Sequence, residues 1–263
     1  MEAGFEEGDV SATNVRSRTS GIDRTLQVMD MLVDRREPMS AYDIAKSVGA
    51  PISTIYRLVD ELVEREMLSR GPDNLVWLGA RLMRYGLVYR QRIDAFGRAE
   101  EEMQRLVAQT GETVQICTRD GGMMLVVGME EGPGHFQVAS RVGTRVPLNW
   151  TASGRLLLGH LGDEERRAAF AASAMPSATG MAELDPERLS AQARADFEAR
   201  LATQFNASEY AVACIASPIR DEAGACVATI SIVLPDRRAE ERQAELAEAV
   251  RRAAAAVERS LGR

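Results

Sequence analysis

The sequence predicts an α+β protein that begins with a winged helix-turn-helix, continues through a short helix, and ends in a domain built on an antiparallel sheet. Three helical segments (21–34, 40–48 and 53–66) precede a hairpin pattern at 68–78, and this is the order of a winged helix. Beyond residue 94, strand and helix patterns alternate, and turn residues join two pairs of strands as hairpins.

The length and composition fit two domains without a membrane segment. The chain has 263 residues, 45% of them hydrophobic, which is enough for two packed cores. No apolar run is long enough for a membrane span or a secretory signal, so we expect a cytoplasmic protein. The predicted divisions are a disordered acidic tail at 1–17, a winged helix at 18–79 with its helix-turn-helix at about 40–59, a linker helix at 80–93, and a C-terminal domain at 94–263.

The net charge of −7 at first argues against a nucleic-acid-binding protein. The acidic excess lies in residues 1–17 and 94–263, however, whereas residues 18–93 contain slightly more basic than acidic side chains. A DNA-binding protein needs a basic strip and not a basic whole, because only the groups that face phosphates displace counterions. The charge distribution therefore permits DNA binding without demonstrating it.

The segment from residue 40 to 58 has the packing residues that a helix-turn-helix needs. Ser40 and Asp43 form a predicted capping box that opens the second helix, and Ser53 is a predicted N-cap for the third helix. Two helices that cross near a right angle need a small residue at the crossing and a glycine in the turn, and Ala45 and Gly49 stand at these positions. The apolar residues expected to face the core around the turn are Ile44, Val48, Ile55 and Leu58.

The C-terminal domain is predicted as a sheet covered on one side by helices. The expected strands are 113–119, 123–130, a strand near 135–141, 210–219 and 225–233. The expected helices are 97–110, 151–161, 163–173, 186–203 and 237–261. Short turns join the first two strands and the last two, which favours an antiparallel sheet.

The exposed side chains of the third helix are the expected DNA contacts, because the N-terminal turn of this helix should enter the major groove. Hydroxyl groups can bond phosphates or bases, tyrosine can contact phosphate or a thymine methyl group, and arginine can pair with guanine through two hydrogen bonds. The expected contacts are Ser53, Thr54, Tyr56 and Arg57 from this helix, Arg24 from the first helix and Arg70 from the wing.

Several of these expected contacts have a structural alternative. Ser53 alternatively serves only as the cap of the third helix. Arg57 alternatively pairs with Asp60 or Glu61, on the same helix. Arg24 and Arg70 are equally compatible with charges that contact only solvent.

With these motifs placed, the chain resembles the IclR family of bacterial transcription regulators over residues 18–263. The N-terminal resemblance is carried by SGIDRTLQVMDML, SAYDIAKSVGAPISTIYRLVDELVEREML and the wing that closes in LVWLG. The C-terminal resemblance is carried by VPLNWTASGRLLLGHL and YAVACIASPIRDEAGACVATISI. It implies a winged helix, a linker helix, and a GAF-like domain that binds an effector and oligomerises. It also implies a homodimer or homotetramer on partly palindromic double-stranded promoter DNA, and leaves open whether the regulator represses or activates.

The resemblance further implies where a small-molecule effector binds, the effectors of similar members being small carboxylates or aromatic catabolites. By position, the implied cavity residues are Val138, Val146, Ala152, Ser153, Val212, Cys214, Ser231 and Val233. Physical chemistry supports part of this set, because backbone N–H groups and a hydroxyl at a helix N-terminus can bind an anion. Ser231 lies in an apolar strand and its hydroxyl needs a partner, for which a ligand carboxylate is one candidate. The alternative is that the valines are core residues and that Cys214 is a buried structural thiol.

The sequence argues against an enzyme. His135 and His160 are the two histidines, and no GxSxG, P-loop or HExxH motif occurs. Cys117, Cys214 and Cys226 have no metal-ligand spacing and make no disulfide framework, so neither a metal nor another cofactor is expected.

The alternative function to a DNA-binding regulator is that of a sensor or adaptor protein whose winged helix binds a protein partner. The expected mechanism is that effector binding shifts the domain arrangement through the 80–93 helix and so changes the fit to DNA.

Overall fold

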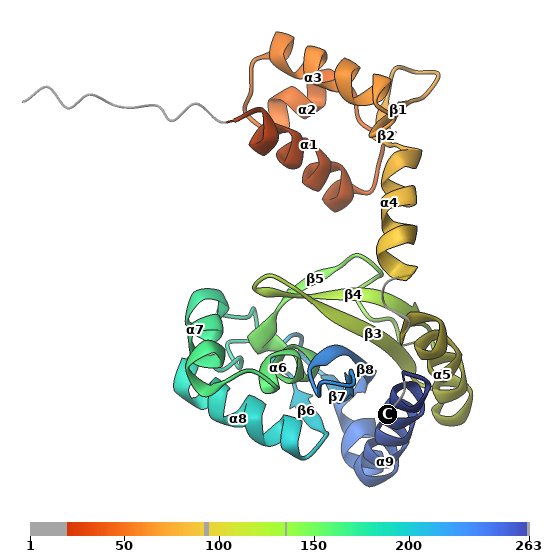
Figure 1. Cartoon of the computed structure of the whole chain (residues 1–263), viewed down its shortest axis with the longest axis vertical. Helices are drawn as coiled ribbons and strands as arrows, with labels where there is room; N and C mark the ends of the chain where they lie inside the picture. Colours follow the sequence, from red (N-terminus) through yellow and green to blue (C-terminus); the bar gives the residue numbers. More distant parts are fainter. Residues whose placement is uncertain (1–19, 92–94, 135, 262–263) are drawn as a thin grey trace, which may run out of the picture. The chain divides into compact units, whose positions relative to one another are not determined.

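The chain folds into two units, seen in a computed structural model that describes residues 20–91, 95–134 and 136–261. One unit extends to Val88 and the other begins at Tyr89, so the division falls inside the helix α4 (Ala80–Gln91) (Figure 1). The predicted tail at 1–17 lies outside the described residues. No helix in the described part of the chain is both long enough and apolar enough to cross a membrane.

The first unit has the predicted order of three helices and a hairpin. Its elements are α1 (Gly21–Arg35), α2 (Ala41–Ser47), α3 (Ile52–Glu64), β1 (Leu68–Arg70) and β2 (Val76–Leu78). Its core consists of inward-facing apolar residues of the three helices and the hairpin, namely Val28, Leu32, Ala41, Ile44, Ala45, Ile55, Val59, Leu62, Leu68 and Val76. Gly49 adopts a φ of 61° in the turn between α2 and α3, where a β-carbon would be strained. The expected helix-turn-helix packing is therefore confirmed.

The helix starts differ in detail from the sequence prediction. The Ser40 hydroxyl accepts from the backbone N–H of Asp43 and donates to its carboxylate, at 3.1 and 2.6 Å. The prediction that Ser53 caps α3 is wrong, because Pro51 is the N-cap and no side chain caps this helix. The proline ring fixes φ near the value that the cap requires, and the Pro51 carbonyl already accepts from Thr54 and Ile55. The helix consequently starts early and leaves the Ser53 side chain exposed in its first turn.

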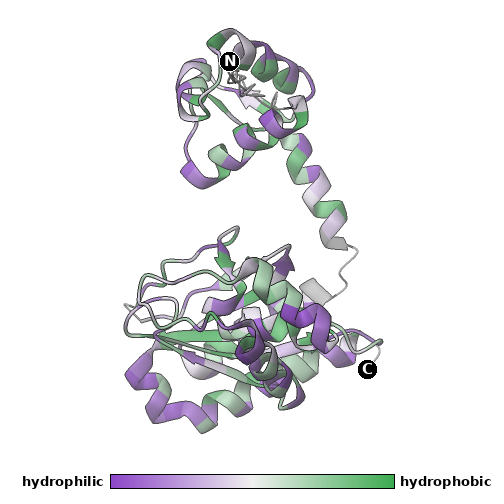
Figure 2. Cartoon of the chain, turned by 90° about the vertical axis from the view of Figure 1, so that its left-hand side faces the viewer, coloured by the Kyte–Doolittle hydropathy of each residue, from purple (hydrophilic) through white to green (hydrophobic). Residues whose placement is uncertain are grey.

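The second unit is built on a six-stranded antiparallel sheet with the order β5-β4-β3-β8-β7-β6. The strands are β3 (Thr113–Asp120), β4 (Met123–Glu130), β5 (Arg145–Pro147), β6 (Ala202–Phe205), β7 (Val212–Arg220) and β8 (Cys226–Pro235). The helices are α5 (Ala95–Thr110), the 3-10 turn η1 (Leu148–Trp150), α6 (Ala152–Gly159), α7 (Asp163–Ser173), α8 (Pro186–Glu198) and α9 (Asp236–Ser260). Figure 2 shows the strands as mostly hydrophobic and the outer surfaces of the helices as largely hydrophilic.

Helices cover both faces of this sheet, which corrects the expectation of a single covered face. Along β8, Ile230 and Ile232 pack into a core with α5 and α9, whereas Ser231 and Val233 face the side of α6. Because successive strand residues point to opposite faces, this alternation requires a layer on each side. The second layer was missed because the sequence showed only the apolar content of the strands, and not which helix would cover which face.

Two element boundaries also differ from the prediction. Residues 136–141 form no strand, and the chain joins the sheet later as β5, after a turn in which Gly143 has a φ of 88°. The helix expected over 186–203 ends at Glu198, and Arg200, with a φ of 55°, reverses the chain into β6. No glycine marks that reversal, so the end of the helix before β6 had no recognisable stop signal.

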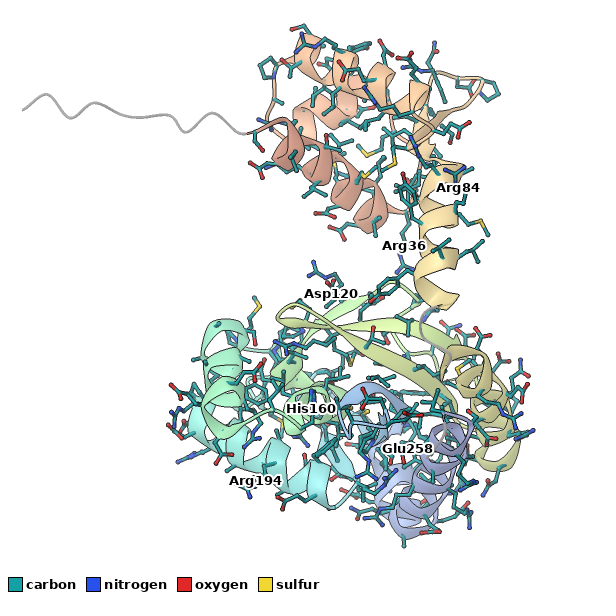
Figure 3. The ribbon with its side chains drawn as sticks, viewed as in Figure 1. Arg36, Arg84, Asp120, His160, Arg194 and Glu258 are labelled. Atoms are coloured by element: carbon teal, nitrogen blue, oxygen red, sulfur yellow. The ribbon has the colours of Figure 1, made fainter. Side chains whose placement is uncertain are left out.

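Buried ion pairs tie α9 to the sheet. Glu258 is only 5% exposed and accepts from the backbone N–H and the guanidinium of Arg220, at 2.8 and 3.2 Å, and from Arg200 at 2.8 Å (Figure 3). Near the other end of α9, Arg238 and Arg242 donate to the buried carboxylate of Glu112, just after α5. A buried carboxylate is tolerated when its oxygens are satisfied in this way, and the helix is thereby fixed against β3 and β7.

Candidate ligand cavity and nucleic-acid interface

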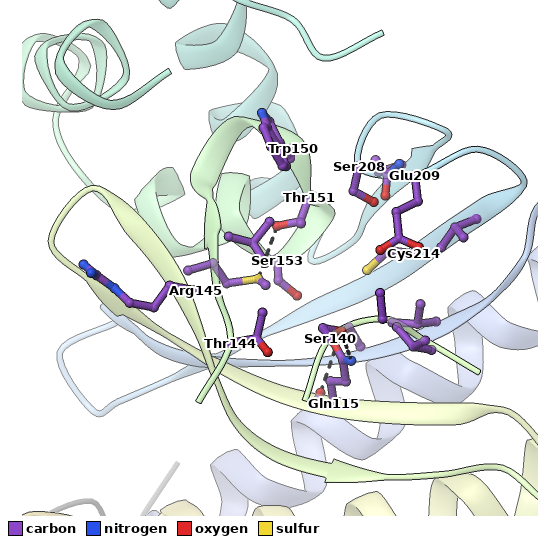
Figure 4. Close-up of a pocket in the computed structure, with 18 residues that line it drawn as sticks. Gln115, Ser140, Thr144, Arg145, Trp150, Thr151, Ser153, Ser208, Glu209 and Cys214 are labelled. Carbon is purple, nitrogen blue, oxygen red and sulfur yellow. Dashed lines mark hydrogen bonds between the residues drawn. The ribbon is translucent and has the colours of Figure 1, made fainter. Parts of the chain in front are cut away.

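A cavity of about 260 Å³ lies on the α6 side of the sheet, between the strands and the loops that precede η1 and β7 (Figure 4). Of the eight residues implied for effector binding, the structure brings together on its walls Val138, Val146, Ser153, Val212, Cys214, Ser231 and Val233. The exception is Ala152, which is buried among the apolar residues around α6 and does not line the cavity. Most of the exposed wall area is apolar, although polar side chains also line the cavity.

The N-terminus of α6 supplies the unsatisfied polar group of this cavity. Thr151 caps the helix, its hydroxyl accepting from the backbone N–H of Gly154 at 2.9 Å. Ser153 is 1% exposed, and its hydroxyl has no hydrogen-bond partner among the described residues, although the Cys117 thiol lies nearby. Ser231 differs, because its hydroxyl donates to the Gln115 carbonyl at 3.4 Å. Ser153, not Ser231, is therefore the hydroxyl that a ligand would satisfy.

The cysteines near the cavity are protonated thiols. Burial raises the pKa of the Cys214 thiol, and the neighbouring backbone N–H groups of Ser153 and Ala152 only partly oppose this effect. Burial also raises the pKa of Cys117 to about 12, with a further increase from Cys214. Neither thiol therefore has the thiolate character that nucleophilic or redox chemistry requires at neutral pH.

The raised pKa of Cys117 predicts a loss of stability at high pH. The unfolded chain releases this proton near pH 9, whereas the folded protein holds it to about 12. Between these values the folded state binds more protons, so stability falls as pH rises, by up to about 1.4 kcal/mol per pH unit for this group. Urea unfolding from neutral pH to above pH 9 would measure the decline. It should be shallower in Cys117→Ala, and an identical decline would contradict the assignment.

On the first unit, the exposed side of α3 carries the four residues expected to read DNA. Ser53, Thr54, Tyr56 and Arg57 are all exposed, while Ile55 between them is buried. Arg57 makes no hydrogen bond or ion pair within the described chain. The alternative in which it pairs with Asp60 or Glu61 is therefore not realised, and Asp60 instead forms an ion pair with Arg70 of the wing.

The two arginines expected outside α3 are engaged within the fold. Arg24 is half-buried and donates to the Gln27 side chain at 3.0 Å and to the Val48 carbonyl, at the end of α2, at 3.1 Å. Arg70 is held against α3 by Asp60. Arg24 thus braces the turn between α2 and α3, and Arg70 braces the wing.

Comparison with known proteins identifies both units. The family model of the IclR helix-turn-helix domain matches residues 21–72, and that of the bacterial transcriptional regulator IclR C-terminal domain matches residues 88–259. The chain belongs to the IclR family. Members of this family are DNA-binding transcription regulators with a C-terminal effector-binding domain, and not enzymes.

IclR regulators that are similar to this protein align with nearly the whole chain. The HTH-type transcriptional repressor AllR of Escherichia coli K12 is 26% identical over 243 residues, covering 92% of this chain and 90% of the relative. The regulator XynR of the same organism is also 26% identical over 243 residues, covering 92% and 96%. An IclR homolog of Microbacterium hydrocarbonoxydans, solved in complex with 4-hydroxybenzoate, is 28% identical with a TM-score of 0.80, covering 92% of this chain and 99% of that one.

The cavity also has polar lining residues that the sequence analysis missed. They are Gln115, Ser140, Thr144, Arg145, Gln204, Ser208 and Glu209. Strand alternation could have placed Gln115 on the face opposite Val114 and Ile116. No periodic signal exists for Ser208 and Glu209, because they lie in a loop whose path depends on its contacts with other segments.

Proposed function

We propose that the effector of this IclR regulator is a small aromatic carboxylate that binds in the α6-side cavity. The observation that carries this proposal is the buried, unpartnered Ser153 hydroxyl at a helix N-terminus inside a mostly apolar cavity. The helix terminus favours an anion, and the valine walls with Trp150 favour an aromatic or aliphatic body. The 4-hydroxybenzoate complex of the Microbacterium hydrocarbonoxydans homolog supports the same class. Val138, Val146, Val212, Cys214, Ser231 and Val233 would complete the binding wall, whereas Ala152 lies outside it.

The proposed DNA contacts are Ser53, Thr54, Tyr56 and Arg57, with α3 in the major groove. Their exposure supports this role, as does the absence of any intramolecular partner for Arg57 within the described chain. Arg70 would approach the DNA backbone from the wing while paired with Asp60. For Arg24 we propose an indirect role, in which it holds the turn that sets the direction of α3.

We further propose a homodimer or homotetramer on partly palindromic promoter DNA in the cytoplasm. Exposed apolar side chains support self-association, because α1 exposes Ile22 and Leu26 and α4 exposes Met83, Leu87 and Val88. Two copies would present two α3 helices to two half-sites. In this account residues 94–263 bind the effector, and the 80–93 helix transmits the resulting population shift to residues 18–79.

A fluorescence anisotropy titration tests this function. The full-length protein is titrated against DNA from the region upstream of its own gene, at two salt concentrations, with an unrelated duplex of equal length as control. Tight, sequence-selective binding that weakens at higher salt is the expected result. Absence of selective binding, together with failure to select any site from a random DNA pool, would favour the protein-binding adaptor.

A further inference from the structure

We propose that Gln115, a buried side chain of the sheet, binds a ring hydroxyl or amino group of the effector through its amide oxygen. This inference rests on the proposed function and adds a specificity-determining residue on a second wall of the same cavity. Gln115 lies between Val114 and Ile116, which pack into the core with α5 and α9. Because strand residues alternate between the faces, Gln115 lines the cavity on the α6 side, and only 4% of it is exposed.

Both N–H groups of the Gln115 amide have acceptors inside the protein. Nε2 donates to Ser140 Oγ at 2.8 Å, which Figure 4 shows as a dashed line, and to the Met129 sulfur at 3.8 Å. A thioether accepts hydrogen bonds and donates none, so the contact with Met129 identifies the nitrogen end of the amide. The other end, Oε1, makes no hydrogen bond within the described part of the chain.

The position of this amide is fixed by bonds at both ends of the side chain. The Gln115 backbone carbonyl accepts from the Ser231 hydroxyl at 3.4 Å. At the other end, the Arg141 guanidinium donates to the Ser140 carbonyl at 3.0 Å, and the Arg141 backbone N–H donates to the Thr144 hydroxyl at 2.8 Å. These bonds limit the movement of Ser140 and hence of the amide that it holds, so Oε1 is presented to a ligand in a preorganised position.

Gln115 and Ser153 lie on different walls and differ in what they bind. The Ser153 hydroxyl, at the N-terminus of α6, favours an anion or another acceptor. Gln115 Oε1 can only accept, so it favours an O–H or N–H donor. An aromatic acid with a hydroxyl or amino group on its ring satisfies both residues. An unsubstituted acid leaves Oε1 buried without a partner, and a methoxy group places a second acceptor against it.

Calorimetric titration of the full-length protein tests this inference. The probes are benzoate, its three monohydroxy isomers including 4-hydroxybenzoate, and the three corresponding methoxybenzoates. In the unchanged protein, we expect one hydroxybenzoate to bind at least about 10-fold tighter than both benzoate and its own methoxy analogue. In Gln115→Met this preference should fall below about 3-fold, while benzoate should bind as tightly as before or tighter, because no amide oxygen is left to desolvate.

The matched control is Gln104→Met, the same substitution at an exposed glutamine of α5 that does not line the cavity. It should keep the preference of the unchanged protein, and equal melting temperatures of the two variants would exclude a folding defect. If a hydroxybenzoate binds but its preference survives in Gln115→Met, or if all probes weaken there by the same factor, the role of Gln115 is overturned while the proposed effector class stands. If none of the probes binds at millimolar concentration, the effector class and the role of Gln115 are both overturned.

Discussion

Arg57→Ala is expected to weaken binding to the specific promoter site by about 10- to 100-fold, since a bidentate arginine–guanine pair contributes about 1–3 kcal/mol. Arg57 is exposed on α3 and has no partner within the described chain, so its removal breaks no intramolecular interaction. Anisotropy titrations against the specific site and against variants of each base pair would measure the loss. Discrimination should relax at one position of each half-site.

Arg24→Ala provides the contrast, because Arg24 braces the α2–α3 turn through the Val48 carbonyl. We expect this variant to lose about 1 kcal/mol of unfolding free energy and some DNA affinity, without a change in the salt dependence of binding. A direct phosphate contact would instead reduce the slope of log K against log salt by about 1. Unchanged affinity in Arg57→Ala would contradict the proposed orientation of α3.

Gly154→Ala is expected to destabilise the second unit by about 3 kcal/mol, and to abolish ligand binding in the cavity. A β-carbon at this position would lie 2.1 Å from the Leu148 carbonyl oxygen and 2.7 Å from its carbonyl carbon. Both atoms belong to the backbone of η1, so they cannot move aside as a flexible side chain would. Relief requires η1 and α6 to separate, which displaces Trp150 and Ser153 together.

The control for this substitution is Gly162→Ala in the same unit, where no heavy atom lies within 4 Å of the added β-carbon. Its cost should stay below about 1 kcal/mol, because Gly162 is a helix N-cap at ordinary φ. Urea unfolding and calorimetry with 4-hydroxybenzoate would compare the two variants. A Gly154→Ala protein that is as stable as the Gly162→Ala protein would contradict the close contact between α6 and η1.

Local patterns predicted the first unit well, because its order, its core and its turn follow from periodicity and from residues such as Ala45 and Gly49. The prediction that Ser53 caps α3 was wrong because Pro51, two residues earlier, sets the start of the helix without a capping side chain. In the second unit the strand β6 was hidden, since Arg200 reverses the chain without a glycine.

For the cavity, resemblance to relatives gave the wall residues near α6 and on β7 and β8, and the structure places all of them except Ala152 around one space. Sequence could not show that Ser231 is satisfied by a backbone carbonyl while Ser153 is left without a partner. That difference depends on the register between β3 and β8 and on the close approach of α6 to the sheet. Glu209 was missed for a similar reason, because contacts with residues distant in sequence fix its loop.

The most direct test of the account measures the coupling between the two units in both directions. The affinity for promoter DNA is determined with and without saturating 4-hydroxybenzoate. The affinity for 4-hydroxybenzoate is then determined with and without promoter DNA. We predict that each ligand changes the affinity for the other by the same factor, of about 5- to 150-fold. Promoter affinity that stays the same when the cavity is saturated would contradict the claim that this cavity controls DNA binding.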